Sequence, residues 1–260
     1  MNNTIRILSK LSLSTLLFLS GGVFLPALEN LMIADSNYFG HLAQSNEASP
    51  VVIVLIGDSI TQGNWENKSW RYNLWTKLMD AEIAFDFVGS LKTNFKGTPD
   101  FPDYKGQTFD RDHEARWGWR TDEILEQLDG WMNGYPSSAD IALIQLGHND
   151  LDQGQTPSST VNEISQIIDK LRAKNPNVVI FLGQSPPEWE PFPSYRAEMA
   201  AFAPAKSLPE SPVILVDHQI DWISDPSLPG AHTYDGVHPG LLGEEKLAQA
   251  WFEALLPYLP

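Results

Sequence analysis

Cysteine is absent from the 260 residues of this chain. A disulfide framework, a thiolate zinc site, a cysteine nucleophile and a lipid-modified N-terminal cysteine are therefore excluded. Basic residues are also scarce, since 17 Lys and Arg stand against 33 Asp and Glu, which gives a formal net charge of −16. Because no stretch concentrates positive charge, the sequence argues against a surface for nucleic acid or anionic lipid. The negative net charge is more compatible with an uncharged or cationic partner than with an anionic one.

A long uninterrupted hydrophobic run is missing as well. Arg6 and Lys10 precede an uncharged stretch over residues 11–28, which glycines and Pro26 interrupt. This order is typical of an export signal, so the sequence predicts a secreted or periplasmic protein. The stretch is borderline in length for spanning a membrane, and an uncleaved membrane anchor is the alternative. The possible last residues of a cleaved signal are Ala27, Ala34 and Ala43.

The rest of the chain has the composition of a globular protein. Apolar residues make up 42% of the sequence, which is enough for one sizeable core. Neither a repeat nor a second domain is visible. We therefore expect an export signal and polar linker over residues 1–50 and a single folded domain over residues 51–260.

Short apolar segments alternate with amphipathic ones in this domain. The expected strands are residues 51–56, 85–88, 141–146, 177–182 and 213–216. The expected helices are residues 69–81, 121–128 with Thr121 as the cap, 158–174, about 241–256, and one short helix within 185–212. Because the strands are apolar throughout and alternate with helices, they predict a parallel sheet covered on both faces. Ligands of such sheets bind beyond the carboxyl ends of the strands.

The first expected strand runs directly into the turn formed by residues 57–63, where Ser59 is the candidate nucleophile. A strand that ends in glycine and enters a helix presents the next residues at the sheet edge, close to unpaired N–H groups. Serine is also a common helix cap, and Gln62 fits a capping box with Ser59. The same residues could therefore simply start a helix.

A serine nucleophile needs a base and a group that orients the base. Asp235 and His238, near the other end of the chain, can supply both. A tight turn through the two intervening residues could bring the carboxylate to Nδ1 of the imidazole and leave Nε2 free to face Ser59. A solvated turn is the alternative interpretation, since Asp, Gly and Pro are common in turns.

Ester hydrolysis also requires hydrogen-bond donors for the negative oxygen that forms on the attacked carbonyl. Asn149 follows a predicted buried strand at the same edge as Ser59 and offers a neutral amide donor. An Asx turn or a helix cap would equally explain this asparagine. The N–H group of Gly118 is a second candidate, because a residue without Cβ lets the backbone approach the substrate.

Together, four motifs resemble the four blocks of the GDSL, or SGNH, hydrolases. They are Gly57-Asp58-Ser59, Gly118, Gly147-His148-Asn149-Asp150 and Asp235-Gly236-Val237-His238, and their order and spacing match over residues 51–256. The resemblance implies a flavodoxin-like three-layer α/β/α sandwich with a five-stranded parallel sheet. It implies Ser59 as nucleophile, His238 as base and Asp235 as its orienter. It also implies an oxyanion hole formed by the N–H groups of Ser59 and Gly118 and the side chain of Asn149, with no metal or other cofactor.

Further residues resemble the bacterial carbohydrate esterases of the acetylxylan type. They are Asp86-Phe87-Val88-Gly89-Ser90, His113-Glu114 and the stretch over residues 235–243. This resemblance implies hydrolysis of acetyl or similar short-chain esters of a carbohydrate through an acyl-enzyme. Two departures are His148, where relatives usually carry Thr, and Ala115-Arg116-Trp117, which is bulkier than expected before the conserved glycine of the second block. The first departure predicts changed substrate contacts beside an intact oxyanion hole, and the second predicts a changed acyl pocket or entrance.

Other functions are also compatible with parts of the sequence. A lysophospholipase or thioesterase of the same family would need an apolar acyl groove. A noncatalytic carbohydrate-binding protein and a phosphate-binding turn over residues 57–63 are alternatives of other classes, although the turn lacks a nearby lysine. Trp117, Trp119 and Trp189 are expected in loops near the site, where they would stack on sugar rings or cover the sheet edge. The remaining histidines lack metal-ligand spacing, and His218 is expected in a hydrogen-bonded structural role.

Overall fold

The computed structural model describes residues 49–184 and 186–260. The predicted export signal and most of the predicted linker lie outside these described residues. The boundary at residue 51 between linker and domain therefore stays a prediction. Among the described helices, none has the length and hydrophobicity needed to cross a bilayer.

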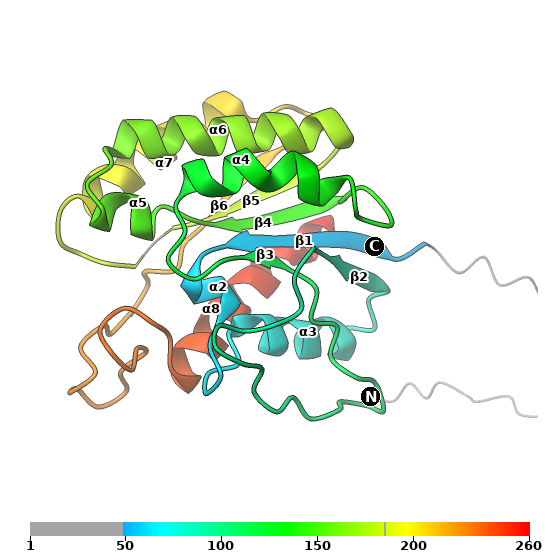
Figure 1. Ribbon diagram of the computed structural model, residues 1–260, viewed down its shortest axis with the longest axis horizontal. Helices are drawn as coiled ribbons and strands as arrows, with labels where there is room; N and C mark the ends of the chain where they lie inside the picture. Colours follow the sequence, from blue (N-terminus) through cyan, green and yellow to red (C-terminus); the bar gives the residue numbers. More distant parts are fainter. Residues whose placement is uncertain (1–48, 185) are drawn as a thin grey trace, which may run out of the picture. The chain divides into compact units, whose positions relative to one another are not determined.

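A parallel sheet with the strand order β2-β1-β4-β5-β6 forms the centre of the fold (Figure 1). Its strands are β1 (Val51–Gly57), β2 (Phe85–Val88), β4 (Ile141–Gln145), β5 (Val179–Gly183) and β6 (Val213–Val216), all within two residues of the predicted bounds. A sixth strand, β3 (Glu114–Ala115), continues the β2 edge by pairing with the end of β1. It was not predicted, because two residues are too few to show a period.

Helices cover both faces of the sheet, which confirms the predicted α/β/α arrangement (Figure 1). One layer consists of α4 (Thr121–Met132), α6 (Pro157–Lys174) and α7 (Phe192–Lys206), and the other of α3 (Trp70–Asp80) and α8 (Leu241–Leu255). The short helices α2 (Ser59–Gln62) and α5 (His148–Asp152) follow β1 and β4, and the 3-10 helix η1 (Leu256–Tyr258) follows α8.

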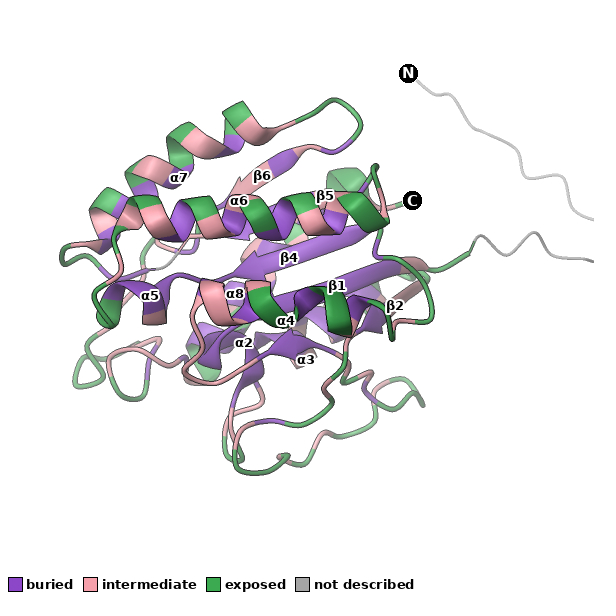
Figure 2. Ribbon diagram, turned by 45° about the horizontal axis from the view of Figure 1, so that its top comes forward, coloured by how far each residue is buried: buried purple, intermediate pink, exposed green. Residues whose placement is uncertain are grey.

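The central strands are buried on both faces, which explains why they form continuous apolar runs (Figure 2). Alternate side chains of a strand point to opposite faces. Val54 and Ile56 of β1 therefore belong to the core beneath α4, α6 and α7, whereas Ile53 and Leu55 belong to the core beneath α3 and α8. Because all strands are parallel, their carboxyl ends lie at one edge of the sheet, on the left in Figure 1.

Helix α4 is longer than predicted and starts differently. It continues through Gly130 to Met132, and its N-cap residue is Arg120 rather than Thr121. Met132 is buried in the core, and Trp131 packs against the same core. Tertiary packing therefore carries the helix past a glycine that is unfavourable by itself.

The predicted short helix within residues 185–212 is the 15-residue helix α7. Proline stands in its first turn and again at Pro204, and these prolines hid the helical pattern in the sequence. Proline is tolerated in the first turn of a helix, where its missing N–H has no intrahelical partner anyway. Tyr195 and Met199 are buried against the sheet and hold the helix in place.

Candidate active site

The turn between β1 and α2 fixes the position of Ser59. A Cβ on Gly57 would lie 2.2 Å from the Thr61 hydroxyl, so only glycine fits where the strand turns into the helix. The Asp58 carboxylate caps α2 by accepting a hydrogen bond from the Ile60 N–H at 2.9 Å. Ser59 is thereby held in the first turn of α2, beyond the carboxyl end of β1, where helix N–H groups have no intrahelical partner.

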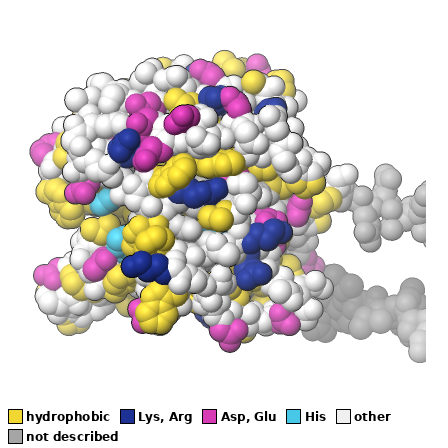
Figure 3. Space-filling model, in the orientation of Figure 1, with side chains coloured by type: hydrophobic (Ala, Val, Ile, Leu, Met, Phe, Trp, Pro, Cys, Tyr) yellow, Lys and Arg dark blue, Asp and Glu magenta, His cyan; other side chains and the backbone are white. Residues whose placement is uncertain are grey.

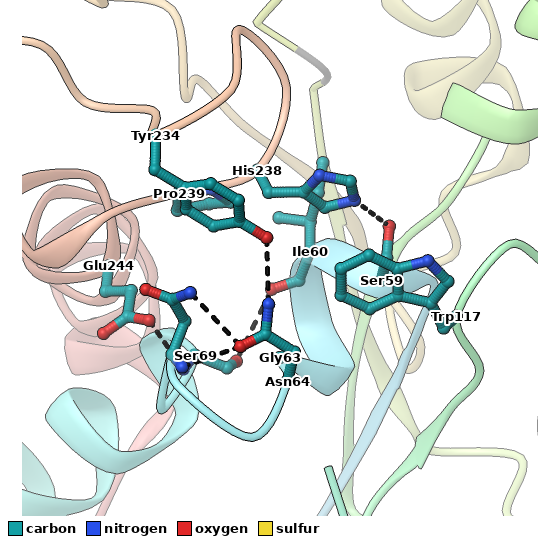
Figure 4. Close-up of a pocket in the computed structure, with 11 residues that line it drawn as sticks. Ser59, Ile60, Gly63, Asn64, Ser69, Trp117, Tyr234, His238, Pro239 and Glu244 are labelled. Carbon is teal, nitrogen blue, oxygen red and sulfur yellow. Dashed lines mark hydrogen bonds between the residues drawn. The ribbon is translucent and has the colours of Figure 1, made fainter. Parts of the chain in front are cut away.

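Ser59, His238 and Asp235 are in direct contact, although 179 positions separate the serine from the histidine. Nε2 of His238 lies 2.9 Å from Oγ of Ser59 (Figure 4), and Nδ1 lies 2.7 Å from Oδ2 of Asp235. The other carboxylate oxygen of Asp235 accepts hydrogen bonds from the N–H groups of Val237 and His238. The structure therefore brings together the three residues that the sequence singled out.

The ionisation of Asp235 suits this arrangement. Burial opposes the charge of its carboxylate, but the hydrogen bonds from the backbone and ring of His238 outweigh burial and lower the pKa of Asp235. The carboxylate is therefore an anion at neutral pH. It can hold the proton of the ring on Nδ1, which leaves Nε2 as the acceptor that faces Ser59.

Two aromatic rings stack on the imidazole of His238. The indole of Trp117 lies 4.4 Å from it with 16° between the planes, and the ring of Tyr234 lies 5.8 Å from it at the same angle (Figure 4). The Tyr234 hydroxyl accepts a hydrogen bond from the Asn64 side chain at 3.0 Å. The sequence placed Trp117 near the site but gave no reason to expect Tyr234 there, except its position next to Asp235.

The loop with Gly118 lies beside the candidate serine. It is tied to the end of β1 by a hydrogen bond of 3.0 Å from the Arg116 N–H to the Gly57 carbonyl. Gly118 has a φ of +79°, which favours glycine, and nothing lies within 4 Å of where its Cβ would stand. In the part of the chain that the structure describes, its N–H group donates to no backbone or side-chain acceptor.

Asn149 lies in the first turn of α5 and contacts the same loop. Its side-chain N–H₂ group donates to the Trp119 carbonyl at 2.9 Å. An amide carries two N–H bonds, so one N–H remains for another acceptor while the hydrogen bond fixes the orientation of the side chain. The roles of Gly118 and Asn149 in an oxyanion hole stay predictions.

A small cavity opens beside Ser59 and His238 and is also lined by Asn64, Trp117 and Tyr234 (Figure 4). Its volume is about 10 Å³, which corresponds to roughly one water-sized sphere. The molecular surface near this end of the sheet carries histidine side chains beside hydrophobic ones, at the left of Figure 3. On the same face, acidic and basic side chains are interspersed.

His148, the departure in the third block, is buried next to the site. Its ring packs against Phe192 at 5.1 Å, and burial lowers the pKa of His148 to about 4. Its Nδ1 has no hydrogen-bond partner among the described residues. A neutral, apolar contact thus replaces the hydroxyl that the family pattern predicts at this position.

His218 does not have the hydrogen-bonded structural role that the sequence predicts. Its ring is buried edge-on against Trp251 at 4.7 Å, and neither ring nitrogen has a partner among the described residues. The ring fits there because Gly183 has no Cβ, which would lie 2.6 Å from it. Burial lowers the pKa of His218 to about 3.

Asp122, Asp150 and Glu163 form the one group of potential metal ligands found among the described residues. These carboxylates already have protein partners. Arg120 pairs with Asp122 at 2.9 Å, and the Thr121 hydroxyl contacts both Asp150 and Glu163. Asp150 also accepts the Thr121 N–H at 2.9 Å, so the group supports the start of α4.

A parallel α/β/α sandwich with serine, histidine and aspartate in contact beyond its strand ends is the arrangement of an α/β serine hydrolase. Residues 55–246 match the GDSL-like Lipase/Acylhydrolase family, and the chain belongs to this family.

Similar proteins include several esterases. The chain is 28% identical over 236 residues to a multidomain esterase of Ruminococcus flavefaciens, covering 83% of this chain and 30% of that protein. A carbohydrate esterase family 3 structure from Talaromyces cellulolyticus is 26% identical with a TM-score of 0.67, covering 80% of this chain and 97% of the other. A mutant acetyl esterase with an acetate ion is 26% identical with a TM-score of 0.68 and the same coverage.

The buried imidazole of His218 predicts a loss of stability in acid. Its pKa of about 3 in the folded chain lies below the ordinary 6.5, so the unfolded chain binds the proton first as the pH falls. The stability that the neutral ring contributes above pH 6.5 is therefore lost as the pH falls toward 3. His218→Phe removes this titration. We therefore expect the free energy of unfolding to fall between pH 7 and 4.5 by roughly 2 kcal/mol less in this variant than in the wild type.

The free energy of unfolding in urea at the two pH values measures this difference. Burial raises the pKa of Asp58 to about 7, which has the opposite effect on the pH dependence. Because Asp58 is present in both proteins, their difference isolates His218. Equal pH dependence in the two proteins would contradict the expected contribution of His218.

Proposed function

We propose that this chain is an exported serine esterase that removes acetyl or similar short acyl groups from a carbohydrate. The observation that carries the proposal is the continuous contact from Ser59 through His238 to Asp235. Membership of the GDSL-like family and the similarity to esterases that act on carbohydrates support the substrate class.

The contacts suggest a two-step reaction. Oγ of Ser59 attacks the carbonyl carbon of the ester, and Nε2 of His238 takes the hydroxyl proton. Asp235 stabilises the imidazolium through Nδ1. When the C–O bond to the sugar breaks, His238 returns the proton to the sugar oxygen and the acyl group stays on Ser59. A water molecule then attacks the acyl-enzyme with His238 again as base, which releases acetate and restores the serine.

The negative oxygen of the tetrahedral intermediate would be bound by the N–H groups of Ser59 and Gly118 and by the Asn149 side chain. The Gly118 N–H, which has no acceptor among the described residues, and the fixed amide of Asn149 support this assignment. Such fixed donors stabilise charge well because they need not reorganise during the reaction.

The comparisons favour a short acyl group over a long one. The similarity to an acetyl esterase structure that holds an acetate ion supports an acetyl group rather than the acyl chain of a lysophospholipid or fatty thioester. A protein that only binds carbohydrate would not require a base in contact with a serine. These two features therefore support an acetyl esterase over the alternatives considered from the sequence.

Export rests on the sequence of the N-terminal segment. Arg6 and Lys10 followed by the uncharged residues 11–28 have the order of an export signal. An exported enzyme would meet carbohydrate polymers outside the cell.

Ser59→Ala is expected to lower kcat for an aryl acetate by roughly 10⁴-fold or more, because the variant lacks the hydroxyl that forms the acyl-enzyme in the proposed reaction. Ser194→Ala, at an exposed position of α7, should keep the wild-type rate. Circular dichroism should show both variants folded. Wild-type turnover by the Ser59 variant would overturn the proposed function.

Asn149→Ala is expected to lower kcat for the same ester by about 10²- to 10³-fold with little change in KM, because its donor acts chiefly on the transition state. Asn162→Ala, at an exposed position of α6, is the matched control. Steady-state kinetics and thermal unfolding separate a catalytic loss from a folding defect. A change confined to KM would contradict a place for Asn149 in the oxyanion hole.

The length of the acyl group is the third test. Rates on aryl acetate, butyrate and octanoate should decrease in that order, because the proposed substrate carries an acetyl group, as the similarity to an acetyl esterase supports. Acetate release from acetylated xylan measures activity on a carbohydrate. If octanoate is the best substrate, the lipase or thioesterase alternative is correct instead.

A further inference from the structure

The ring of Trp117 lines the cavity beside Ser59 and also contacts the candidate base, His238. The indole stacks on the imidazole of His238 at 4.4 Å. Phe95 stacks on the same indole at 4.7 Å with 14° between the planes. The imidazole thus rests against a pair of aromatic rings from two different loops.

This pair of rings is tied to the helix that carries the candidate nucleophile. The Trp117 N–H donates to the side-chain carbonyl of Gln62, the last residue of α2, at 2.7 Å. The Phe95 N–H donates to the carbonyl of Gly63 at 3.0 Å. Because α2 begins with Ser59, these bonds hold the stacked rings at a fixed position relative to the serine.

Stacking on indole has an electrostatic consequence for the imidazole. The face of an aromatic ring carries negative charge density and attracts a cation placed over it. His238 becomes a cation when it takes the proton of Ser59. The indole therefore favours the charged ring that forms during the reaction, and it also restricts rotation of the ring away from Ser59.

We propose that Trp117 is a positioning residue that orients His238 and stabilises its protonated form. The proposal rests on the proposed function, in which His238 is the base. It assigns a role to a residue that departs from the family pattern, where small residues are expected before Gly118.

Other titratable groups also lie around His238. Asp235 contacts Nδ1, Tyr234 stacks on the ring, and His148 lies close enough to interact electrostatically. Glu244 lines the same cavity. Since a change at Trp117 leaves these groups in place, a comparison of variants at this position reports on the indole.

The test compares Trp117→Phe with Trp117→Leu. Both side chains are smaller than indole and apolar, but only phenylalanine keeps an aromatic face. We expect the leucine variant to lower kcat for an aryl acetate about tenfold with unchanged KM, and to move the acidic limb of the pH–rate profile down by about 0.5 pH unit. The phenylalanine variant should recover most of both effects.

Trp222 provides a matched control, because its ring stacks on His232 at 5.1 Å with 20° between the planes. Trp222→Phe and Trp222→Leu should leave kcat and the pH profile unchanged. If the Trp117 variants do not fold, Phe95→Leu replaces them, because it removes the ring behind the indole and should lower kcat about threefold.

The possible outcomes separate the two proposals. An inactive wild type, or an active Ser59→Ala variant, would overturn the proposed function. An active wild type with equal kcat and equal pH profiles for Trp117→Phe and Trp117→Leu would overturn only the role of Trp117. If the Trp117 variants do not fold, an unchanged kcat in a folded Phe95→Leu variant would likewise overturn only the role of Trp117.

Discussion

The packing of α3 against α8 determines whether the segments that carry Ser59 and His238, at opposite ends of the folded domain, meet at the site. The start of α8 follows directly on the turn that carries His238, and Glu244 in its first turn accepts the Ser69 N–H at 2.8 Å. Further along, the rings of Trp70 and Trp251 lie 5.5 Å apart, with both side chains fully buried. The start of α3 is also bonded to α2, because the Ser69 hydroxyl donates to the Thr61 carbonyl at 2.7 Å and the Arg71 side chain donates to the Gln62 carbonyl at 3.0 Å. A shift of α8 relative to α3 would therefore move the imidazole away from Ser59.

Much of the fold could be predicted from the sequence because the sheet is parallel and covered on both faces. Strands in such a sheet are nearly continuous apolar runs, and this signal located the five longer strands even though β2 contains Asp86. This sequence signal is absent from elements that form because of tertiary packing. Strand β3 has two residues, and α7 continues through Pro204 because buried Tyr195 and Met199 hold it against the sheet.

The contact between Ser59, His238 and Asp235 could be predicted because each residue stands in a recognisable motif at a strand end or before a helix. Aromatic stacking had no comparable signal. Neither Trp117 nor Tyr234 has a spacing that distinguishes a ring on a histidine from a ring in the core or in solvent. The buried, unpartnered ring of His218 was likewise hidden, because its environment is made by residues far away in the sequence.

The contact of Asp235 with His238 also determines the order of events in the proposed reaction. Because Asp235 occupies Nδ1, only Nε2 of the imidazole is left to exchange protons with Ser59 and the reactants. The sugar oxygen receives its proton from Nε2, and the water later donates a proton to Nε2. Both must therefore occupy the same position next to this atom, one after the other. Hydrolysis of the acyl-enzyme cannot begin until the sugar has left, so departure of the first product controls entry of the second reactant.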